Sequence, residues 1–425
     1  MCMQIELHSP ARKIVFLGMC FFLSAIYLSF CTREFLASYF SGNVDLASLT
    51  KATSLEPANA DYWHILARYH LFVVQEPGTA LPLLNSAIRL NPHRADYWLD
   101  LSNAYQLLGN PDDRNRAIER AIAADPTNPE IAWQAANLYW IEGKPNEALH
   151  EFRIVAENDP HLAGAAVERC WRIRPDATAL LDNALPPRAD IYSAFLEFLI
   201  SKNEPAAGAL VWDRMAHLQA PVGTRYVFGY IHYLIDHRQI DQAERVWRDS
   251  ANLADLADYQ PSSANLVVNG DFSLPVLNGG FDWLYQTVPG VALAIDVTES
   301  HSAQQSLSVI FDSGGLEDTG IRQLIPVRPH TDYEFSAYFK SENLEGAGGP
   351  RFVLQDVSTG SSLFSSDELK GADFWKQVGG TLTTGPDTNL LLLRLVRIPA
   401  NNAIRGKLWI DGVKLARKQL SDGAE

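Results

Sequence analysis

The sequence is poor in cysteine, and this limits the kinds of site that it can build. Only four of the 425 residues are cysteines, and Cys2, Cys20 and Cys31 lie in or beside an N-terminal apolar segment. Because Cys170 stands alone in the long C-terminal part, a disulfide within that part and a CxxC metal or redox site are both excluded. We expect Cys170 to be a small, buried apolar residue.

The sequence also lacks the short motifs of common enzyme classes. It contains no HExxH, no Gly-x-Ser-x-Gly, no phosphate-binding loop and no cluster of cysteines and histidines. We therefore predict that the protein is not an enzyme. A weaker alternative stays open, a degenerate protein associated with glycoside hydrolases, because a catalytic pair of carboxylates comes together only in the fold.

Basic residues are outnumbered by acidic ones. The chain has 35 Lys and Arg against 50 Asp and Glu, which gives a formal net charge of -15. Such a surface repels phosphate groups, so a nucleic-acid partner is not expected.

The first feature that is present is a long apolar run near the N-terminus. Ile14 to Cys31 is 18 residues without a charge, close to the length that spans a bilayer, and it has no polar face. Arg12 and Lys13 precede the run, whereas the Arg33/Glu34 pair that follows it is neutral, which favours a cytoplasmic N-terminus. We predict a single-pass anchor in a bacterial inner membrane, with the bulk of the chain in the periplasm.

A cleaved signal peptide followed by secretion is the alternative reading of this run. The residues before Cys31 are Leu28, Ser29 and Phe30, which form neither a small-x-small cleavage site nor a lipoprotein site. The anchor is therefore the preferred prediction.

Two markers recur in phase after the apolar run. Asp61-Tyr62-Trp63 returns as Asp96-Tyr97-Trp98, 35 positions later, and Trp133 follows Trp98 by another 35. A proline after Glu, Asn or Asp keeps nearly the same step, at Pro57, Pro92, Pro126 and Pro160. Between markers, apolar residues at helical spacing surround a break such as Gly109-Asn110-Pro111, which predicts two helices per unit. A repeat of this period implies a stacked superhelix of helix pairs.

These residues resemble the tetratricopeptide repeat family from Leu46 to Pro160. The chain departs from the family where Ala67, Ser102 and Asn137 stand in place of a glycine. Beyond Pro160 the register loosens, and two further helix pairs are predicted at 191–218 and 225–253. The resemblance implies that a partner protein binds in the groove of the array, and Arg68, Asn103 and Asn137 are the candidate groove residues.

The pattern changes after 259–264, which we predict to be a linker. Short segments with period-two alternation and Gly/Pro turns then predict an antiparallel β-sandwich or jelly roll. The expected strands are 265–268, 291–297, 306–311, 320–327, 332–340, 351–356, 375–382, 389–398 and 407–415.

Several phrases of this region resemble carbohydrate-binding modules of families 4 and 9. They include Asn265 to Phe272, Gly280 to Trp283 and Leu408 to Leu415, and the resemblance covers Asn265 to about Arg417. It implies that a glycan binds, because the CH faces of sugar rings stack on aromatic rings and polar groups fix the hydroxyls. The candidate ligand residues are Trp375, Tyr285, Tyr338, Trp283, Phe374, Arg322 and Gln355, with Gln323 and Arg394 as further polar candidates. Trp283 and Trp409 are also expected to serve the core.

The same resemblance implies a structural calcium ion near the ends of the sandwich. Asp271 and Asp411 stand at the places of the family's acidic ligands, but Ser273 and Gly412 replace two others. Calcium takes about six to eight oxygen ligands, so these losses weaken the prediction. No other cofactor is required.

The sequence thus predicts a multidomain α + β protein that acts as a membrane-anchored scaffold. Its parts are a cytoplasmic N-terminus (1–13), an anchor (14–31), helical repeats (45–258), a linker (259–264), a sandwich (265–417) and a tail (418–425). Similar repeat proteins serve in the assembly and export of bacterial exopolysaccharide, which suggests that context. The main alternative is an assembly protein whose sandwich is purely structural and binds no sugar.

Overall fold

The computed structural model describes residues 9–302, 304–400 and 402–418. Contacts divide the chain into two compact units, Met1–Pro186 and Pro187–Glu425. The boundary falls inside the predicted repeat region 45–258, so the last two helix pairs share a unit with the sandwich. Cys2 and the ends of the predicted N-terminus and tail, 1–8 and 419–425, lie outside the described residues.

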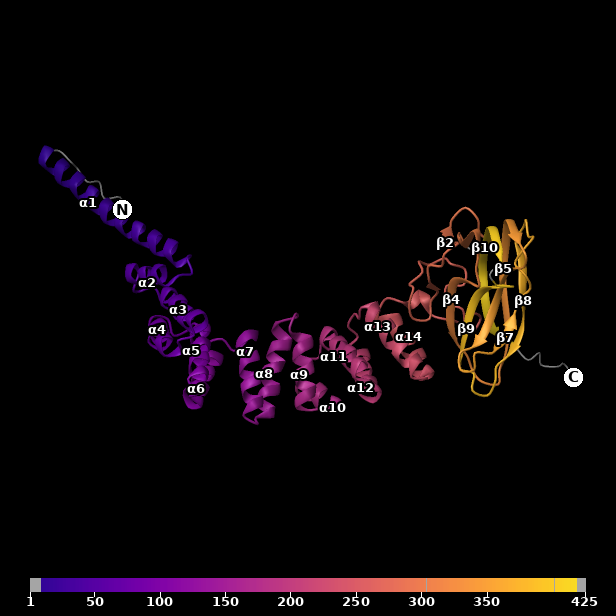
Figure 1. Ribbon diagram of the computed structural model, residues 1–425, viewed down its shortest axis with the longest axis horizontal. Coiled ribbons are helices and arrows are strands. Elements are labelled where there is room, and N and C mark those ends of the chain that lie inside the picture. The colour runs from indigo at the N-terminus through magenta and orange to yellow at the C-terminus, as the bar shows by residue number, and fades with distance from the viewer. Residues whose placement is uncertain (1–8, 303, 401, 419–425) are drawn as a thin grey trace. The chain divides into compact units, whose positions relative to one another are not determined.

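The first unit consists of helices that follow one another as antiparallel pairs (Figure 1). Helix α1 (Pro10–Ser41) precedes the predicted repeats, and α2 (Leu46–Leu55) is the first helix within them. The others are α3 (Ala60–Arg68), the π-helix η1 (Tyr69–Val74), α4 (Pro77–Leu90), α5 (Ala95–Leu107), α6 (Pro111–Ala124), α7 (Pro129–Ile141), α8 (Pro145–Asn158), α9 (Ala163–Ile173) and α10 (Ala177–Asn183).

The repeated residues build the turns between these helices. Gly109 and Gly143 take positive φ angles of 69° and 73° at the ends of α5 and α7, where a side chain would be strained. Pro111 and Pro145 then open α6 and α8, where a missing N–H does no harm.

A hydrogen bond explains why the Trp and Pro markers recur together. The indole Nε1 of Trp63 donates to the carbonyl oxygen of Pro57 at 2.9 Å, and Trp98 donates to Pro92 at the same distance. Each bond ties the first helix of a pair to the loop before it. The two markers are therefore two ends of one contact in the first two repeats.

Helix α1 is continuous over 32 residues and extends well past the predicted span 14–31. It is the one helix of the described residues that is long and apolar enough to cross a membrane, a property that signal sequences share. Its last turns pack against α2, where Ala37 is fully buried and Arg33 pairs with Glu56 at 3.1 Å. The apolar helix thus continues directly into the first helix pair.

The second unit begins with two helix pairs and continues into a β-sandwich. Its helices are α11 (Ala189–Lys202), α12 (Pro205–Leu218), α13 (Thr224–Asp236), α14 (Ile240–Leu253) and the short 3-10 helix η2 (Ala257–Tyr259). The strands are β1 (Leu284–Tyr285), β2 (Val291–Asp296), β3 (Ser306–Gly315), β4 (Asp318–Pro326), β5 (Asp332–Gly346), β6 (Gly349–Asp356), β7 (Ser362–Ser365), β8 (Lys376–Thr383), β9 (Leu390–Ile398) and β10 (Ala403–Arg417).

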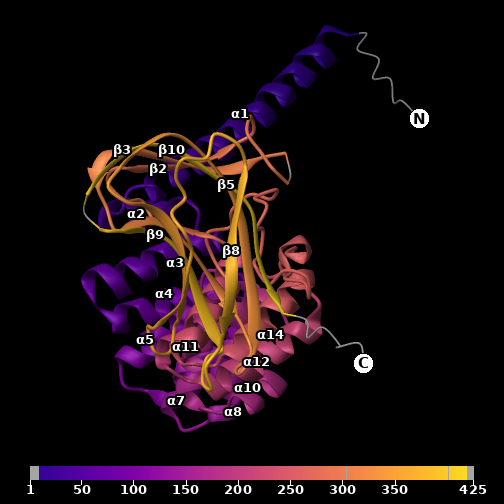
Figure 2. The ribbon, with the colours of Figure 1, turned by 90° about the vertical axis from the view of Figure 1, so that its right-hand side faces the viewer.

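The strands form two five-stranded sheets, in the orders β1-β4-β9-β6-β7 and β2-β3-β10-β5-β8. All pairings between named strands are antiparallel, and the neighbouring strands β5 and β8 are visible in Figure 2. The predicted order of a helical region followed by an antiparallel sandwich is confirmed.

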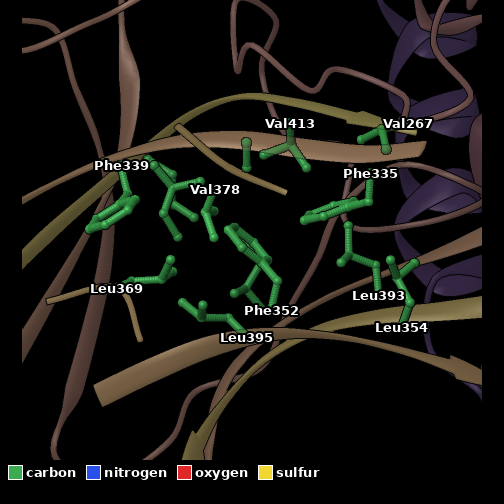
Figure 3. Packing of buried hydrophobic residues seen from close by; sticks show 14 of the residues in the cluster. Val267, Phe335, Phe339, Phe352, Leu354, Leu369, Val378, Leu393, Leu395 and Val413 are labelled. Carbon is green, nitrogen blue, oxygen red and sulfur yellow. The ribbon is translucent and has the colours of Figure 1, made fainter. Parts of the chain in front are cut away.

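The core lies between the two sheets. Phe335, Phe339 and Val378 from one sheet meet Phe352 and Leu395 from the other, and all five are buried (Figure 3). The alternation along β5 produces this layer, since Phe335, Ala337 and Phe339 face the core and the residues between them do not.

One predicted strand, 265–268, is not a strand. Its backbone is held by single bonds instead: Leu266 N donates to the Leu415 carbonyl, and the side chain of Asn265 bonds to backbone groups of Val413, Val267 and Leu415. A side chain that bonds its own neighbours in this way competes with a strand ladder.

The end of the last helix pair is buried against the sandwich. The indole of Trp247 on α14 is buried, and its ring centroid lies 5.9 Å from that of Phe281. Arg328 adds ion pairs to Asp241 and Glu244 of α14, both at 2.9 Å. In the segment 259–264, Tyr259 is buried, and its hydroxyl donates to the Pro275 carbonyl at 2.7 Å. These contacts explain why helices and sandwich form one unit.

Gly280 is a point of close approach in this junction. Its φ is +62°, and a Cβ there would lie 2.2 Å from the Trp247 ring. We expect Gly280→Ala to lower the free energy of unfolding by at least about 2 kcal/mol more than Gly371→Ala. Gly371 is the matched control, because it has a φ of +65° and open space around its Cβ. Chemical denaturation followed by tryptophan fluorescence measures both, and equal losses would show that the indole moves aside freely.

A buried carboxyl, Asp282, follows Phe281 in this region. Its Oδ2 accepts from the Leu277 N–H at 2.7 Å, whereas no donor of the described residues reaches Oδ1. Burial raises the pKa of Asp282 to about 6, from 3.8. The folded state therefore binds this proton more tightly than the unfolded chain does.

This shift predicts a pH dependence of stability. Below about pH 4 the carboxyl is protonated in both states, and as the pH rises to about 6 the folded state loses up to about 3 kcal/mol. Asp282→Asn removes the charge, so its stability relative to the wild type should improve by this amount between pH 4 and pH 7. Denaturation curves at both pH values measure the difference in stability between the variant and the wild type. A difference that does not change with pH would contradict the raised pKa of Asp282.

Candidate functional site

The sandwich carries an exposed cluster of aromatic side chains on the outer face of the sheet that contains β5 and β8. We call His301, Tyr338 and Trp375 the aromatic patch; the candidate Phe374 precedes Trp375 in the chain. The rings of His301 and Tyr338 stack with centroids 3.6 Å apart, and Trp375 lies 5.8 Å from His301. Phe374 is 85% exposed. Within the patch His301 is exposed, whereas Tyr338 and Trp375 are half-buried.

Three separate elements bring these rings together. Tyr338 points outward from β5, because its neighbours Ala337 and Phe339 are in the core. Trp375 immediately precedes β8, whose Gln377 is directly opposite Tyr338. His301 comes from the loop between β2 and β3.

Asp411 holds that loop in place. Its fully buried carboxylate accepts from the backbone N–H groups of His301 and Ser302 at 2.6 and 2.8 Å. The Ser302 hydroxyl and the Gly412 N–H donate to its other oxygen, both at 2.6 Å. An ion pair of 2.9 Å between Glu299 and Lys340 ties the loop to β5. His301 is thus positioned on Tyr338 by its own backbone.

Trp409 is buried beside the patch on the outer side of the sheet rather than in the core. Leu408 and Ile410 face the core, so Trp409 points away from it, and its Nε1 donates to Asp296 at 2.9 Å. Lys407 pairs with the same carboxylate at 2.9 Å. Together these bonds hold the pKa of Asp296 well below its usual value, and the bond from Lys407 has the largest effect.

Two of the aromatic candidates pack in or against the core. Trp283 is buried, stacks on Phe272 with centroids 5.2 Å apart, and donates to the Asn269 carbonyl. Tyr285 packs against the core, and burial raises the pKa of its phenol. Trp283 therefore has no free face for a ligand, whereas Tyr285 is half-buried against the core.

The polar candidates are separated from the aromatic patch. Arg322, Gln355 and Arg394 lie on the outer face of the other sheet, where Arg322 is directly opposite Arg394. Arg394 is fixed by Asp318 at 2.5 Å and by Gln355 at 3.2 Å. Gln323 is buried and bonds the backbone of Val268. The predicted aromatic and polar residues therefore do not form one site.

The carboxylate of Asp411 is not free to bind a calcium ion. Both oxygens of Asp411 accept from N–H and O–H donors, and Asp271 accepts from the backbone and hydroxyl of Ser273. In the part of the chain that the structure describes, no group of three His, Cys, Asp or Glu side chains could hold a metal. Asp411 acts as a hydrogen-bond acceptor for the loop.

A second candidate site is a groove of about 730 Å³ in the first unit. It is lined by the first helices of three consecutive pairs, α3 with η1, α5 and α7, and two of the predicted groove residues, Arg68 and Asn103, line it. Asn137 does not, since its amide donates to the Trp133 carbonyl within α7.

A buried charge cluster supports this groove from beneath. Asp100 is buried and accepts from His64 Nε2 at 2.8 Å, from Asn103 at 3.4 Å, and lies 3.6 Å from Arg68 Nε. The side chain of Arg68 is 57% exposed. The cluster holds one basic side chain at the surface of the groove.

Sequence reasoning missed His301, Asp100 and Phe72. Nothing around His301 distinguishes it from a loop residue, because its position depends on Asp411, 110 residues away. For Phe72 a signal existed, because its repeat is one residue longer than the next two and has Gln75 where they have Gly109 and Gly143.

No family model and no curated protein matches the chain. Among solved structures, a CBM4 module is 14% identical over 36% of this chain and 99% of the module, with a TM-score of 0.27. The MamA protein is 14% identical over 44% of this chain and 91% of its own, with a TM-score of 0.25. YrrB, a TPR protein with an unusual peptide-binding site, is 19% identical over 41% of this chain and 76% of its own, with a TM-score of 0.24. Each similarity covers less than half of this chain.

The role of Asp411 is open to a direct test. Without its carboxylate the amides of His301 and Ser302 lose their acceptor, so we expect Asp411→Ala to speed their hydrogen exchange at least about tenfold. Adding Ca²⁺ or a chelator to the wild type should leave its melting temperature unchanged. A melting temperature that rises with Ca²⁺ would contradict the hydrogen-bonding role and revive the metal site.

Proposed function

We propose that this protein is a non-catalytic, membrane-anchored scaffold that binds a glycan through the aromatic patch and a protein segment through the groove of its helical unit. The observation that carries the glycan half is the patch itself. Sugar rings expose flat CH faces, and the exposed His301 and the half-buried Trp375, 5.8 Å apart, offer rings on which such faces can stack. The exposed Gln377, directly opposite Tyr338, is a polar group nearby that can bond hydroxyls.

The anchor of this scaffold is α1. Its apolar length, its exposed side chains and the basic Arg12 and Lys13 before it support a single span with the N-terminus in the cytoplasm. The helical units and the sandwich would then lie in the periplasm. An envelope role in polysaccharide assembly or export is the corresponding proposal, and it rests on the resemblance of the architecture.

A second candidate function follows from the junction. Because Trp247 and Arg328 bury the end of the helical array against the sandwich, the sandwich is also suited to act as an end cap that binds no sugar. The two functions differ in whether the aromatic patch is occupied.

Glycan arrays probed with the full chain in detergent micelles separate these functions. We expect a polysaccharide to bind, and Trp375→Ala to weaken that binding about tenfold by removing a stacking surface worth about 1–2 kcal/mol. The control is Trp140→Ala, an exposed indole of α7 in the other unit. A folded protein that binds no glycan, or a Trp375→Ala variant that binds as well as the wild type, would favour the end cap.

A further inference from the structure

Strand β2 lies at the edge of its sheet and lacks the features that usually protect an edge. It pairs with β3 on one side only. Its six residues, Val291–Asp296, include no lysine, proline or glycine, and its pairing with β3 shows no bulge. Native sheets guard their edges with such features, because a row of unpaired backbone groups invites another strand. The edge of β2 is therefore open to pairing.

The other three edge strands differ from β2. Strands β1 and β7 have only two and four residues, too few for a long pairing. Strand β8 begins with Lys376 and contains Gly379 and Gly380, and its core-facing Val378 and Leu382 are already buried. Among the strands that the structure describes, β2 is thus the one long edge without protection.

The ladder with β3 shows which backbone groups lie on the open side of β2. An N–H of β3 donates to the Gly290 carbonyl at 3.2 Å, so Gly290 directs its backbone groups toward β3. This direction alternates along an antiparallel pair, so Ala292 and Ala294 also bond to β3. Leu293 and Ile295 direct their N–H and C=O groups to the open side. Among the described residues, none of the backbone bonds outside the ladders involves either of them.

The hydrophobic core is also open beside β2. Val291, Leu293 and Ile295 pack against the core but are only half-buried. Their neighbours one strand further in, Val309 and Phe311 of β3, are buried. An added strand that carries large apolar side chains on the core side would remove the exposed apolar surface of β2 from water.

The strand that fits this edge must also have small side chains on its outer side, where Ala292 and Ala294 are exposed. Strand β2 of a second copy meets all these requirements. A two-fold axis perpendicular to the sheet makes the two identical strands antiparallel and keeps both core sides together. Because opposite residues share a face, one residue must lie opposite its own copy, and Leu293 is the central one. Ala292 and Ala294 then lie opposite each other.

We infer that β2 pairs with β2 of a second copy of this chain, so that the two five-stranded sheets become one sheet of ten strands. The N–H and C=O groups of Leu293 bond to those of Leu293 in the second copy, and the N–H of Ile295 bonds to the carbonyl of Val291. The paired strands are short, so the dimer is weak and its population depends on concentration.

The pairing also has a consequence for the aromatic patch, which lies on the outer face of the same sheet. Both outer faces lie on one side of the joined sheet, so the two patches face the same way. Seven strand spacings separate β5 from β5 of the second copy, about 34 Å without twist. A polysaccharide that reaches both patches would bind with avidity. This consequence rests on the proposed function, whereas the pairing itself does not.

Amide hydrogen exchange, measured residue by residue on the full chain in detergent micelles, tests the pairing. We expect the N–H groups of Leu293 and Ile295 to exchange at least about tenfold more slowly in concentrated than in dilute samples. The N–H groups of Ala292 and Ala294 bond to β3 and should be protected equally in both samples. If Leu293 and Ile295 exchange fast at every concentration, as they would if the chain associated only through α1, the proposal is overturned.

A proline at the centre of the edge gives a second test. Leu293→Pro removes the N–H on the open side and no bond to β3, and Leu293→Ala is the matched control that loses the same side chain but keeps the N–H. We expect the dimer dissociation constant of the proline variant to be at least about tenfold higher than that of the alanine variant in sedimentation experiments. Equal constants would overturn the proposal.

A charged edge replaces the proline if that variant does not fold. Ile295→Lys places a charge on the open edge, and Thr381→Lys places one at an exposed position of the other edge strand, β8. We expect only Ile295→Lys to dissociate the dimer, and equal association of the two variants would contradict pairing through β2. Neither readout involves a glycan, so a failure of the glycan half of the proposed function leaves these tests unchanged.

Discussion

Each helix pair in this chain has an apolar face that only a neighbour can bury, and this constraint governs the arrangement of the molecule. In the first unit the next pair supplies the cover, as when Leu101 and Ala104 of α5 join the cluster of Leu84 and Ala87 from α4. At the end of the array no further pair follows α14. The sandwich takes that place, with Phe281 against Trp247 and glycines where side chains would collide. A solenoid needs such a terminal cover to stay soluble.

The two candidate sites share a physical design. In each, a buried aspartate fixes groups that solvent can reach: Asp411 positions the loop that carries His301, and Asp100 holds Arg68 from beneath. A buried carboxylate is tolerated because several donors satisfy it. Placing the fixed charge below the surface leaves the aromatic rings and the guanidinium free to meet a ligand, so rigidity and exposure do not conflict.

Much of the fold could be predicted from periodicity. The helices of the repeats form where the sequence predicts them, and the predicted pairs at 191–218 and 225–253 match α11 to α14 within a few residues. Both predictions succeed because apolar residues at helical spacing and Gly/Pro breaks act locally. The pair α9 and α10 was missed, since α10 has only seven residues and shows no clear period. The strands β1 and β7 were missed for the same reason, with two and four residues.

For the candidate sites, too, some features could be predicted from the sequence and others depend on tertiary packing. From the sequence alone came the repeat period, the apolar N-terminal helix, the alternation that turns Tyr338 outward, and Arg68 and Asn103 as groove residues. Only the tertiary structure decided that Trp283 is buried and Tyr285 packs against the core, that Arg322 and Gln355 lie on the opposite sheet from Trp375, and that Asp411 bonds the loop of His301. The reason is that local spacing determines which way a side chain points from its own element, whereas packing between elements distant in sequence determines what it meets there.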